Sequence, residues 1–164
     1  MKQFIRLATA AVLVLLLLTY CVAPPQLKNM IVQFDKPVFE STGKSVRVES
    51  VTGSEVAGGH EMFRKALIAS LKNSNLFTAV VTEGSADYKL TAFIIGEEFE
   101  DKYFEQAIGL NVKYMLYRES TNEVVFDKMM PNSTTGNQHT ARIQEMAVKE
   151  NIIFLLNELS RLKL

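Results

Sequence analysis

The stretch Leu110-Asn111-Val112-Lys113-Tyr114-Met115-Leu116-Tyr117 has the clearest structural pattern in this chain. Large apolar side chains take every second position from Leu110, and the alternate set begins with Asn111 and Lys113. A period of two predicts a strand of an antiparallel sheet with one buried face. A turn follows at 119–122, so residues 107–130 are predicted to form a hairpin.

Further elements are predicted on both sides of this hairpin. Strands are expected at Met30–Phe34, at Ser45–Thr52 and at Tyr88–Ile95, the last of which is apolar on both faces over its second half. Apolar residues at three- and four-residue spacing predict amphipathic helices over 60–75 and 140–163. The polar, glycine-containing residues 131–138 are expected to form a loop.

Each predicted helix and the predicted sheet has one apolar side, and these sides must be buried against each other. The sequence therefore predicts an α+β fold. It is a two-layer sandwich, in which two main helices pack on one face of a mainly antiparallel sheet of four or five strands.

The chain has 164 residues, 18 basic and 18 acidic side chains, and one cysteine. This length suits a single domain that buries a core without disulfides or metals. The balanced charge gives no electrostatic footprint for nucleic acid or anionic lipid, so no nucleic-acid partner is expected. The predicted division is a signal peptide over 1–20, a stiff, proline-containing tether over 21–29 and one α+β domain over 30–164.

The N-terminus has the pattern of an export signal. Lys2 and Arg6 precede the uncharged residues 7–18, and a charged start before about seven to fifteen apolar residues is typical of secretory signals. A helix that spans a bilayer needs roughly 20 apolar residues, more than this segment offers. Leu18-Thr19-Tyr20-Cys21 is similar to the lipobox of bacterial lipoproteins, in which a lipid-modified cysteine becomes the first residue after cleavage. Tyr20 stands where that family usually has Gly, Ala or Ser.

The resemblance implies that Cys21 is the lipid attachment site and carries acyl chains such as palmitate. Buried acyl chains contribute about 0.8 kcal/mol per methylene, and two or more chains hold a protein stably on a membrane. Val22 replaces the Asp that favours inner-membrane retention in enterobacterial lipoproteins, which implies the periplasmic face of the outer membrane. An uncleaved signal anchor and plain secretion stay open as alternatives.

Two further segments resemble envelope lipoproteins of Gram-negative bacteria. Ala66-Leu67-x-x-Ser70-Leu71, running into Leu76-Phe77 and Ala86-Asp87-Tyr88-x-Leu90, is similar to the helix-to-strand junction of lipopolysaccharide-assembly and ABC-transport auxiliary lipoproteins. Ala141-Arg142-x-x-Glu145-x-Ala147-x-x-x-Asn151-Ile152 resembles a C-terminal signature of functionally unassigned lipoproteins. The likeness implies a small α+β domain over residues 60–164 and carries over no active-site residue.

Acidic residues cluster in the middle of the chain, at Glu97, Glu98, Glu100, Asp101 and Glu105. Hard cations bind several carboxylate oxygens, but the spacing here lacks the pattern and the glycine of an EF-hand loop. A solvated charged loop between two strands is therefore expected, and no metal site. The aromatic residues Phe99, Tyr103 and Phe104 lie within this cluster. Exposed aromatics beside charge suit a contact with a partner, and core packing is the alternative for them.

No catalytic constellation is found in the sequence, and no cofactor is expected. Gly43-Lys44-Ser45 lacks the earlier glycine and the following helix of a phosphate-binding loop. His60 and His139 are the only histidines, and each precedes or begins a predicted helix as a surface or capping residue. The sequence contains no nucleophile elbow, no pair of histidines at helical spacing and no dinucleotide-binding fingerprint.

These observations predict a non-enzymatic, lipid-anchored periplasmic accessory or scaffold protein that binds another component of the cell envelope. The predicted partners are the membrane, through the N-terminal lipid, and an envelope protein. Two alternatives stay open. A carrier of a lipid or other amphiphile would use a gap between the helices and the sheet. An enzyme would bring His60 or His139 into a pocket with the acidic residues.

Overall fold

The computed structural model describes residues 23–164 apart from 37, 57, 103–104 and 137–139. The side chains of Phe99, Asp101, Lys102, Glu105 and Thr140 also lie outside the description. The elements in chain order are α2 (Leu27–Met30), β1 (Ser45–Gly53), α3 (Gly59–Ser74), β2 (Ala79–Val81), β3 (Tyr88–Lys102), β4 (Glu105–Arg118), β5 (Glu123–Gly136) and α4 (Thr140–Leu159).

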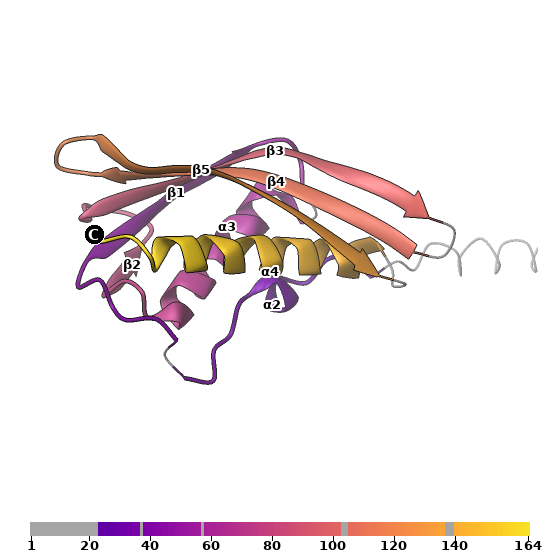
Figure 1. Ribbon diagram of the computed structural model, residues 1–164, viewed down its shortest axis with the longest axis horizontal. Helices are drawn as coiled ribbons and strands as arrows, with labels where there is room; N and C mark the ends of the chain where they lie inside the picture. Colours follow the sequence, from indigo (N-terminus) through magenta and orange to yellow (C-terminus); the bar gives the residue numbers. More distant parts are fainter. Residues whose placement is uncertain (1–22, 37, 57, 103–104, 137–139) are drawn as a thin grey trace, which may run out of the picture.

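The five strands form one sheet in the order β2-β1-β3-β4-β5. β1 runs parallel to β2 and β3, whereas the longer β3–β4 and β4–β5 pairings are antiparallel. α3 and α4 cover one face of the sheet, and α2 lies on the side of α4 that faces away from the sheet (Figure 1). The predicted α+β sandwich with a mainly antiparallel sheet is confirmed.

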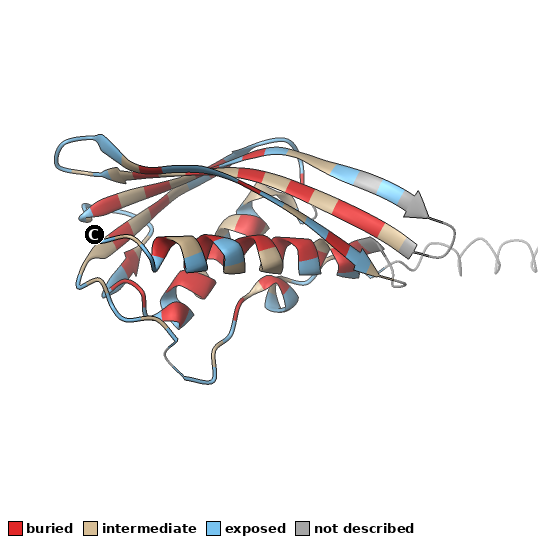
Figure 2. Ribbon diagram, viewed as in Figure 1, coloured by how far each residue is buried: buried red, intermediate tan, exposed pale blue. Residues whose placement is uncertain are grey.

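The central strands bury one side, as their alternation predicts. In β4, every second residue from Ile108 to Leu116 is completely buried against the helices, and Leu90 and Ile94 do the same in β3. From the helices, Phe63, Leu67 and Leu71 of α3 join the same core. Figure 2 shows the buried residues concentrated where the helices meet the sheet.

A polar network lies inside this core. The Tyr114 hydroxyl of β4 donates a hydrogen bond to Asn151 Oδ1 of α4 at 2.8 Å, and both residues are fully buried. Asn151 Nδ2 donates to Met130 O at 2.8 Å and to Leu110 O at 3.3 Å, so one side chain links α4 to two strands. Burial raises the pKa of the Tyr114 hydroxyl, which therefore stays protonated.

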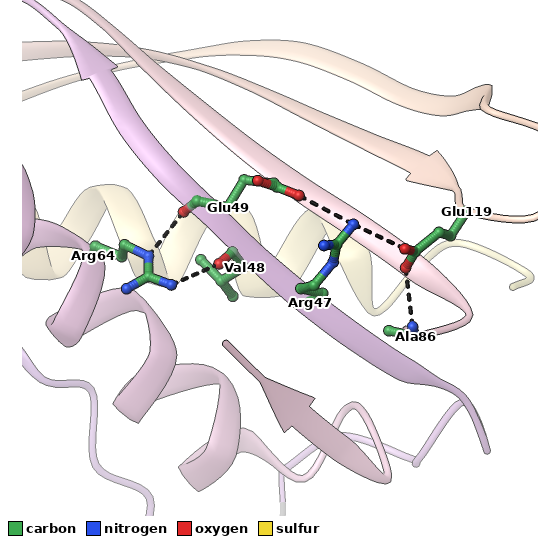
Figure 3. Close-up of polar contacts among 6 residues, drawn as sticks. All are labelled: Arg47, Val48, Glu49, Arg64, Ala86 and Glu119. Atoms are coloured by element: carbon green, nitrogen blue, oxygen red, sulfur yellow. Dashed lines mark hydrogen bonds and ion pairs between the residues drawn. The ribbon is translucent and has the colours of Figure 1, made fainter. Parts of the chain in front are cut away.

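β1 departs from a regular ladder near its middle, where its register with β3 shifts between Val48 and Val51. Arg64 of α3 donates from Nε to Glu49 O at 3.0 Å and from Nη2 to Val48 O at 3.1 Å (Figure 3). The guanidinium group thus satisfies carbonyls at the irregularity. Gly53 ends β1 with a positive φ of 107°, and a Cβ atom there would lie 2.1 Å from Ile94 O.

The strand predicted at Met30–Phe34 is wrong. Met30 ends α2, and the residues after it form no strand. Met30 and Val32 are buried as a strand would require, but α3 replaces the neighbouring strand. Val32 N donates to Ser70 Oγ at 2.9 Å, and Asn73 Nδ2 donates to Val32 O at 3.0 Å. Side chains of a helix therefore satisfy this backbone in place of a ladder.

Two predicted loops are also wrong, because the strands on either side continue through them. β3 extends to Lys102 and β4 begins at Glu105, so all five residues of the acidic cluster lie in paired strands. β5 extends to Gly136, so the loop expected at 131–138 is largely strand. Pro131 is tolerated because β5 is an edge strand, where a missing N–H need not break a ladder.

Candidate functional site

The face of the sheet opposite the helices is the candidate functional site. All the described helices lie on the other side (Figure 1). We call this surface the open face and define it by the alternate residues of β3, β4 and β5 that point away from the core. Over the half of the sheet nearer the β4–β5 turn they are Lys89, Thr91, Phe93, Ile95, Asn111, Lys113, Met115, Tyr117, Val124, Asp127 and Met129, and the same face continues through Glu98, Gly109 and Pro131.

Large apolar side chains are exposed on the open face. Phe93 is 47% exposed and Met129 is 53% exposed, and both lie opposite Lys113 in the register of the three strands. Ile95 and Val124 are exposed as well. Single exposed apolar residues are ordinary, but several on one uncovered face are typical of an interaction site.

The charged groups between these side chains are already paired. Lys113 Nζ lies 3.1 Å from Asp127 Oδ1, and Lys89 Nζ lies 4.8 Å from the centre of the Tyr117 ring. The Tyr117 hydroxyl donates to Met115 Sδ at 3.2 Å. Lys113 is neutralised by Asp127, so the area around Phe93 and Met129 is mainly apolar, and Lys89 keeps its positive charge beside it.

An ion-pair cluster borders the open face at β1. Arg47 Nη2 lies 2.8 Å from Glu119 Oε1 and 3.2 Å from Glu49 Oε1 (Figure 3). Glu119 Oε2 also accepts a hydrogen bond from Ala86 N at 2.9 Å. The cluster joins β1 to the segment between β4 and β5, and to the start of β3, so it holds this border of the sheet in place.

Two concavities lie beside the apolar residues. One, of about 350 Å³, lies between β5 and α4 and is lined by Met129, Phe154 and Glu158 among others. Lys128 Nζ pairs with Glu158 Oε2 there, and this hydrogen bond lowers the pKa of the Glu158 carboxyl. The other, of about 390 Å³, lies farther along the strands, where Glu98 stands beside Gly109.

The residues predicted for lipid attachment and partner contact lie wholly or partly outside the described part of the chain. Cys21, Tyr103 and Phe104 lie outside the described residues, and so does His139. The backbone of Phe99 pairs with Ile108 in the β3–β4 ladder, and its side chain is outside the description. Cys21 as lipid site and Phe99, Tyr103 and Phe104 as partner contacts therefore stay predictions.

The remaining predicted polar residues lie apart from one another. His60 is in the first turn of α3, with Nε2 2.9 Å from Ser54 O, so it contacts its own preceding loop. Glu97 of β3 accepts a hydrogen bond from Gln144 Nε2 at 3.0 Å. Among the described residues, no three His, Cys, Asp or Glu side chains converge in a way that could hold a metal ion. None of the described helices is long and apolar enough to cross a membrane.

The exposed residues Phe93 and Met129 were not predicted as site residues. The sequence offered a weak signal for Phe93, because the predicted strand around it is apolar on both faces although only one face can meet the helices. Met129 had no comparable signal, since an exposed and a buried methionine look alike until the register of β5 is known.

Comparisons with known proteins show what this fold is similar to. The sequence matches no protein-family model and no curated protein. A solved protein of the DUF330 family from Xanthomonas campestris has a TM-score of 0.64 at 12% identity, over 84% of this chain and 90% of that chain. A dodecameric PelC variant from Paraburkholderia phytofirmans has a TM-score of 0.55 at 14% identity, over 76% of this chain and 94% of that chain. A hypothetical protein from Chlamydia trachomatis has a TM-score of 0.55 at 9% identity, over 71% and 98%.

At these identities the similarity shows a shared fold. Lipoproteins from Acinetobacter baumannii and Neisseria meningitidis also match, at TM-scores of 0.49 and 0.44, and such low similarity carries no argument about this chain. The matched structures thus include uncharacterised proteins and lipoproteins of Gram-negative bacteria, and their names describe no enzyme. The resemblance to lipopolysaccharide-assembly lipoproteins stays a prediction.

Proposed function

We propose that this chain is a lipid-anchored, non-enzymatic accessory protein of the bacterial envelope that binds another envelope protein through its open face. The observation that carries the proposal is the sheet with helices on one side and exposed Phe93, Ile95 and Met129 on the other. Acylated Cys21 would hold the domain at the periplasmic face of the outer membrane. The similarity in fold to proteins of Gram-negative bacteria supports this setting.

The chemistry of the open face suits a protein partner. Aromatic residues and methionine are enriched at the centres of protein interfaces, and charged residues are depleted there. Phe93 and Met129 supply such a centre, and the Lys113–Asp127 pair leaves little net charge to desolvate. By contrast, the alternative of an amphiphile carrier needs space between the layers, and completely buried side chains such as Leu67 and Leu90 occupy that region.

Site-specific photo-crosslinking in living cells tests the proposed interface. A benzoyl-phenylalanine residue in place of Phe93, in the full chain, should form an adduct with one envelope protein that mass spectrometry identifies. The same residue in place of Val38, which is 61% exposed and lies in a different part of the surface, should not form it. Met129→Ser should weaken the Phe93 adduct, whereas Val38→Ser, at an exposed site in the loop after α2, should leave it intact.

Three outcomes would contradict the proposal. The same adduct from positions 93 and 38 would mean that the contact does not involve the open face. No adduct from position 93 would mean that the face is unpartnered. An adduct of two copies of this chain would replace the envelope partner by self-association, a result to be looked for because the PelC protein of similar fold is a dodecamer.

The lipid anchor needs its own test. Metabolic labelling with a fatty-acid analogue should mark the full chain, and Cys21→Ala should abolish both the label and the membrane retention. An unmodified Cys21 thiol in the mature protein, found by mass spectrometry together with free diffusion in the periplasm, would overturn the anchored part of the proposal.

A further inference from the structure

The segment that leads to the predicted anchor is fastened to the helical side of the molecule. Gln26 N donates a hydrogen bond to Glu145 Oε1 of α4, and Asn29 Nδ2 donates to Glu145 Oε2 at 2.7 Å. Farther on, Val32 is bonded to α3 and Met30 is completely buried. The chain therefore reaches the domain beside α4, on the side opposite the open face (Figure 1).

The distance from the anchor to this attachment is short. Gln26 is the fifth residue after Cys21, and an extended chain spans at most about 3.6 Å per residue. Acylated Cys21 would therefore hold Gln26 within roughly 18 Å of the lipid that it enters. The surface around Gln26 and Glu145 is the part of the described domain that the anchor brings nearest to the bilayer.

This surface carries unpaired positive charge around a concavity. Lys28, Arg142 and Lys149 line a hollow of about 450 Å³ together with Ile31 and Met146. Glu145 also lines it, but that side chain is buried and accepts hydrogen bonds from the strap of residues 26–29. None of the three cations forms an ion pair with another described residue.

The arrangement on α4 places apolar and basic groups together. Arg142, Met146 and Lys149 follow one another at spacings of four and three residues, so they lie on one side of the helix. Arg142 and Met146 are exposed, and Met146 is 36% exposed. Basic residues around an apolar side chain are typical of surfaces that lie on anionic lipid.

We infer that this face, centred on Lys28, Arg142, Met146 and Lys149, docks on the anionic phospholipid headgroups of the membrane that holds the anchor. The inference rests on the proposed acylation of Cys21. A lipid chain and a basic patch together fix a protein to a membrane better than either alone. Docking would also orient the domain, because the open face then points away from the bilayer and toward a partner.

An environment-sensitive fluorophore tests the docking. Acylation blocks the sulfur of Cys21, the only cysteine, so Met146→Cys in the full lipidated chain offers one free thiol for a nitrobenzoxadiazole label. The labelled protein is bound to phosphatidylcholine vesicles or to vesicles that also contain phosphatidylglycerol. We expect a shift of the emission to shorter wavelength on the anionic vesicles only, and its reversal near 1 M salt, where charge interactions are screened within about 3 Å. A label at Met129→Cys on the open face should show no shift.

A matched pair of charge reversals separates docking from anchoring. Arg142→Glu/Lys149→Glu should abolish the shift at position 146 while the protein still sediments with both vesicles. Lys89→Glu/Lys113→Glu makes the same change of charge on the open face and should keep the shift. Sedimentation without any shift on anionic vesicles, or an unchanged shift in the α4 variant, would overturn the docking and leave the anchor standing. Failure of the wild-type chain to sediment with either vesicle would overturn both.

Discussion

The two faces of the sheet are built by the same strands but differ in burial. Along β4, Leu110 and Tyr114 are completely buried beneath α4, whereas Lys113 and Met115 on the alternate positions are partly exposed. The covered face holds the fold together, and the open face has apolar side chains that the fold does not need. Substitutions on the covered face should therefore lower stability, and substitutions on the open face should lower binding without lowering stability.

The largest effect is expected at the polar centre of the covered face. Asn151→Leu keeps a similar volume but removes the partner of the Tyr114 hydroxyl and of the Met130 and Leu110 carbonyls. Each buried polar group left unsatisfied costs about 1–3 kcal/mol, so we expect a loss of at least about 3 kcal/mol in the free energy of unfolding. Urea denaturation followed by circular dichroism measures it.

The matched control is Asn157→Leu, the same change on the exposed side of α4. It should alter the free energy of unfolding by no more than about 0.5 kcal/mol. Equal losses in the two variants would mean that leucine at any position of α4 is harmful, and the buried network would then have no special role.

A smaller effect is expected where the N-terminal strap meets the covered side. Glu145→Ala removes the acceptor for Gln26 N and Asn29 Nδ2 and should cost about 1–3 kcal/mol, since it removes two part-buried hydrogen bonds to a carboxylate. The expected signature is local: amide hydrogen exchange of residues 26–30 should become faster, and exchange in β4 should stay slow. If amide exchange of residues 26–29 stays as slow as in wild type, burial of Met30 alone is sufficient to hold this segment against the domain.

The sequence predicted the covered face well and the open face poorly, for a physical reason. The period-two pattern around Tyr114 and the helical stripe of α4 report burial, which is what hydrophobic patterning encodes. Charge usually marks solvent, so the sequence predicts a loop at Glu97 and Glu98, yet β3 continues through them and stays paired with β4. The apolar residues of Met30–Phe34 predict a strand, and Met30 and Val32 are indeed buried, but the pattern does not say which element they pack against.

The open face can be recognised only when the pairing register of the strands is known, and the hydrophobic pattern of the sequence does not give that register. Phe93 and Met129 come together across Lys113 only when three strands are aligned. Glu145 and Asn151 were part of a family resemblance, but their partners lie on segments distant in sequence. Long-range pairing of this kind is absent from any single stretch of sequence.

On the open face, a substitution should reduce binding without reducing the free energy of unfolding. Phe93→Ser/Met129→Ser removes two exposed apolar side chains and should change the free energy of unfolding by no more than about 0.5 kcal/mol per site. The adduct formed by benzoyl-phenylalanine in place of Ile95, another exposed apolar residue of the open face, should nevertheless be lost. A destabilisation as large as that of Asn151→Leu would mean that these side chains are part of the core, and the contrast between the faces would fail.

The smallest effect is expected at the end of the sheet, where Asp87 belongs to neither face. Hydrogen bonds from Ser45 N at 2.8 Å and Ser45 Oγ at 2.7 Å hold the pKa of the Asp87 carboxyl below its usual range. A carboxyl whose pKa is lowered on folding adds stability above its unfolded pKa, about 3.9, and that stability is lost as the pH falls through the folded value.

Asp87→Asn should therefore lower the urea midpoint slightly at pH 7, and the difference from wild type should shrink below about pH 4. Asp35→Asn, at an exposed aspartate in the loop after α2 without a hydrogen-bond partner among the described residues, should leave the urea midpoint at pH 7 close to that of wild type. A difference for Asp87→Asn that persists unchanged in acid would assign the effect to packing at the β1–β3 end and not to the ionised carboxylate.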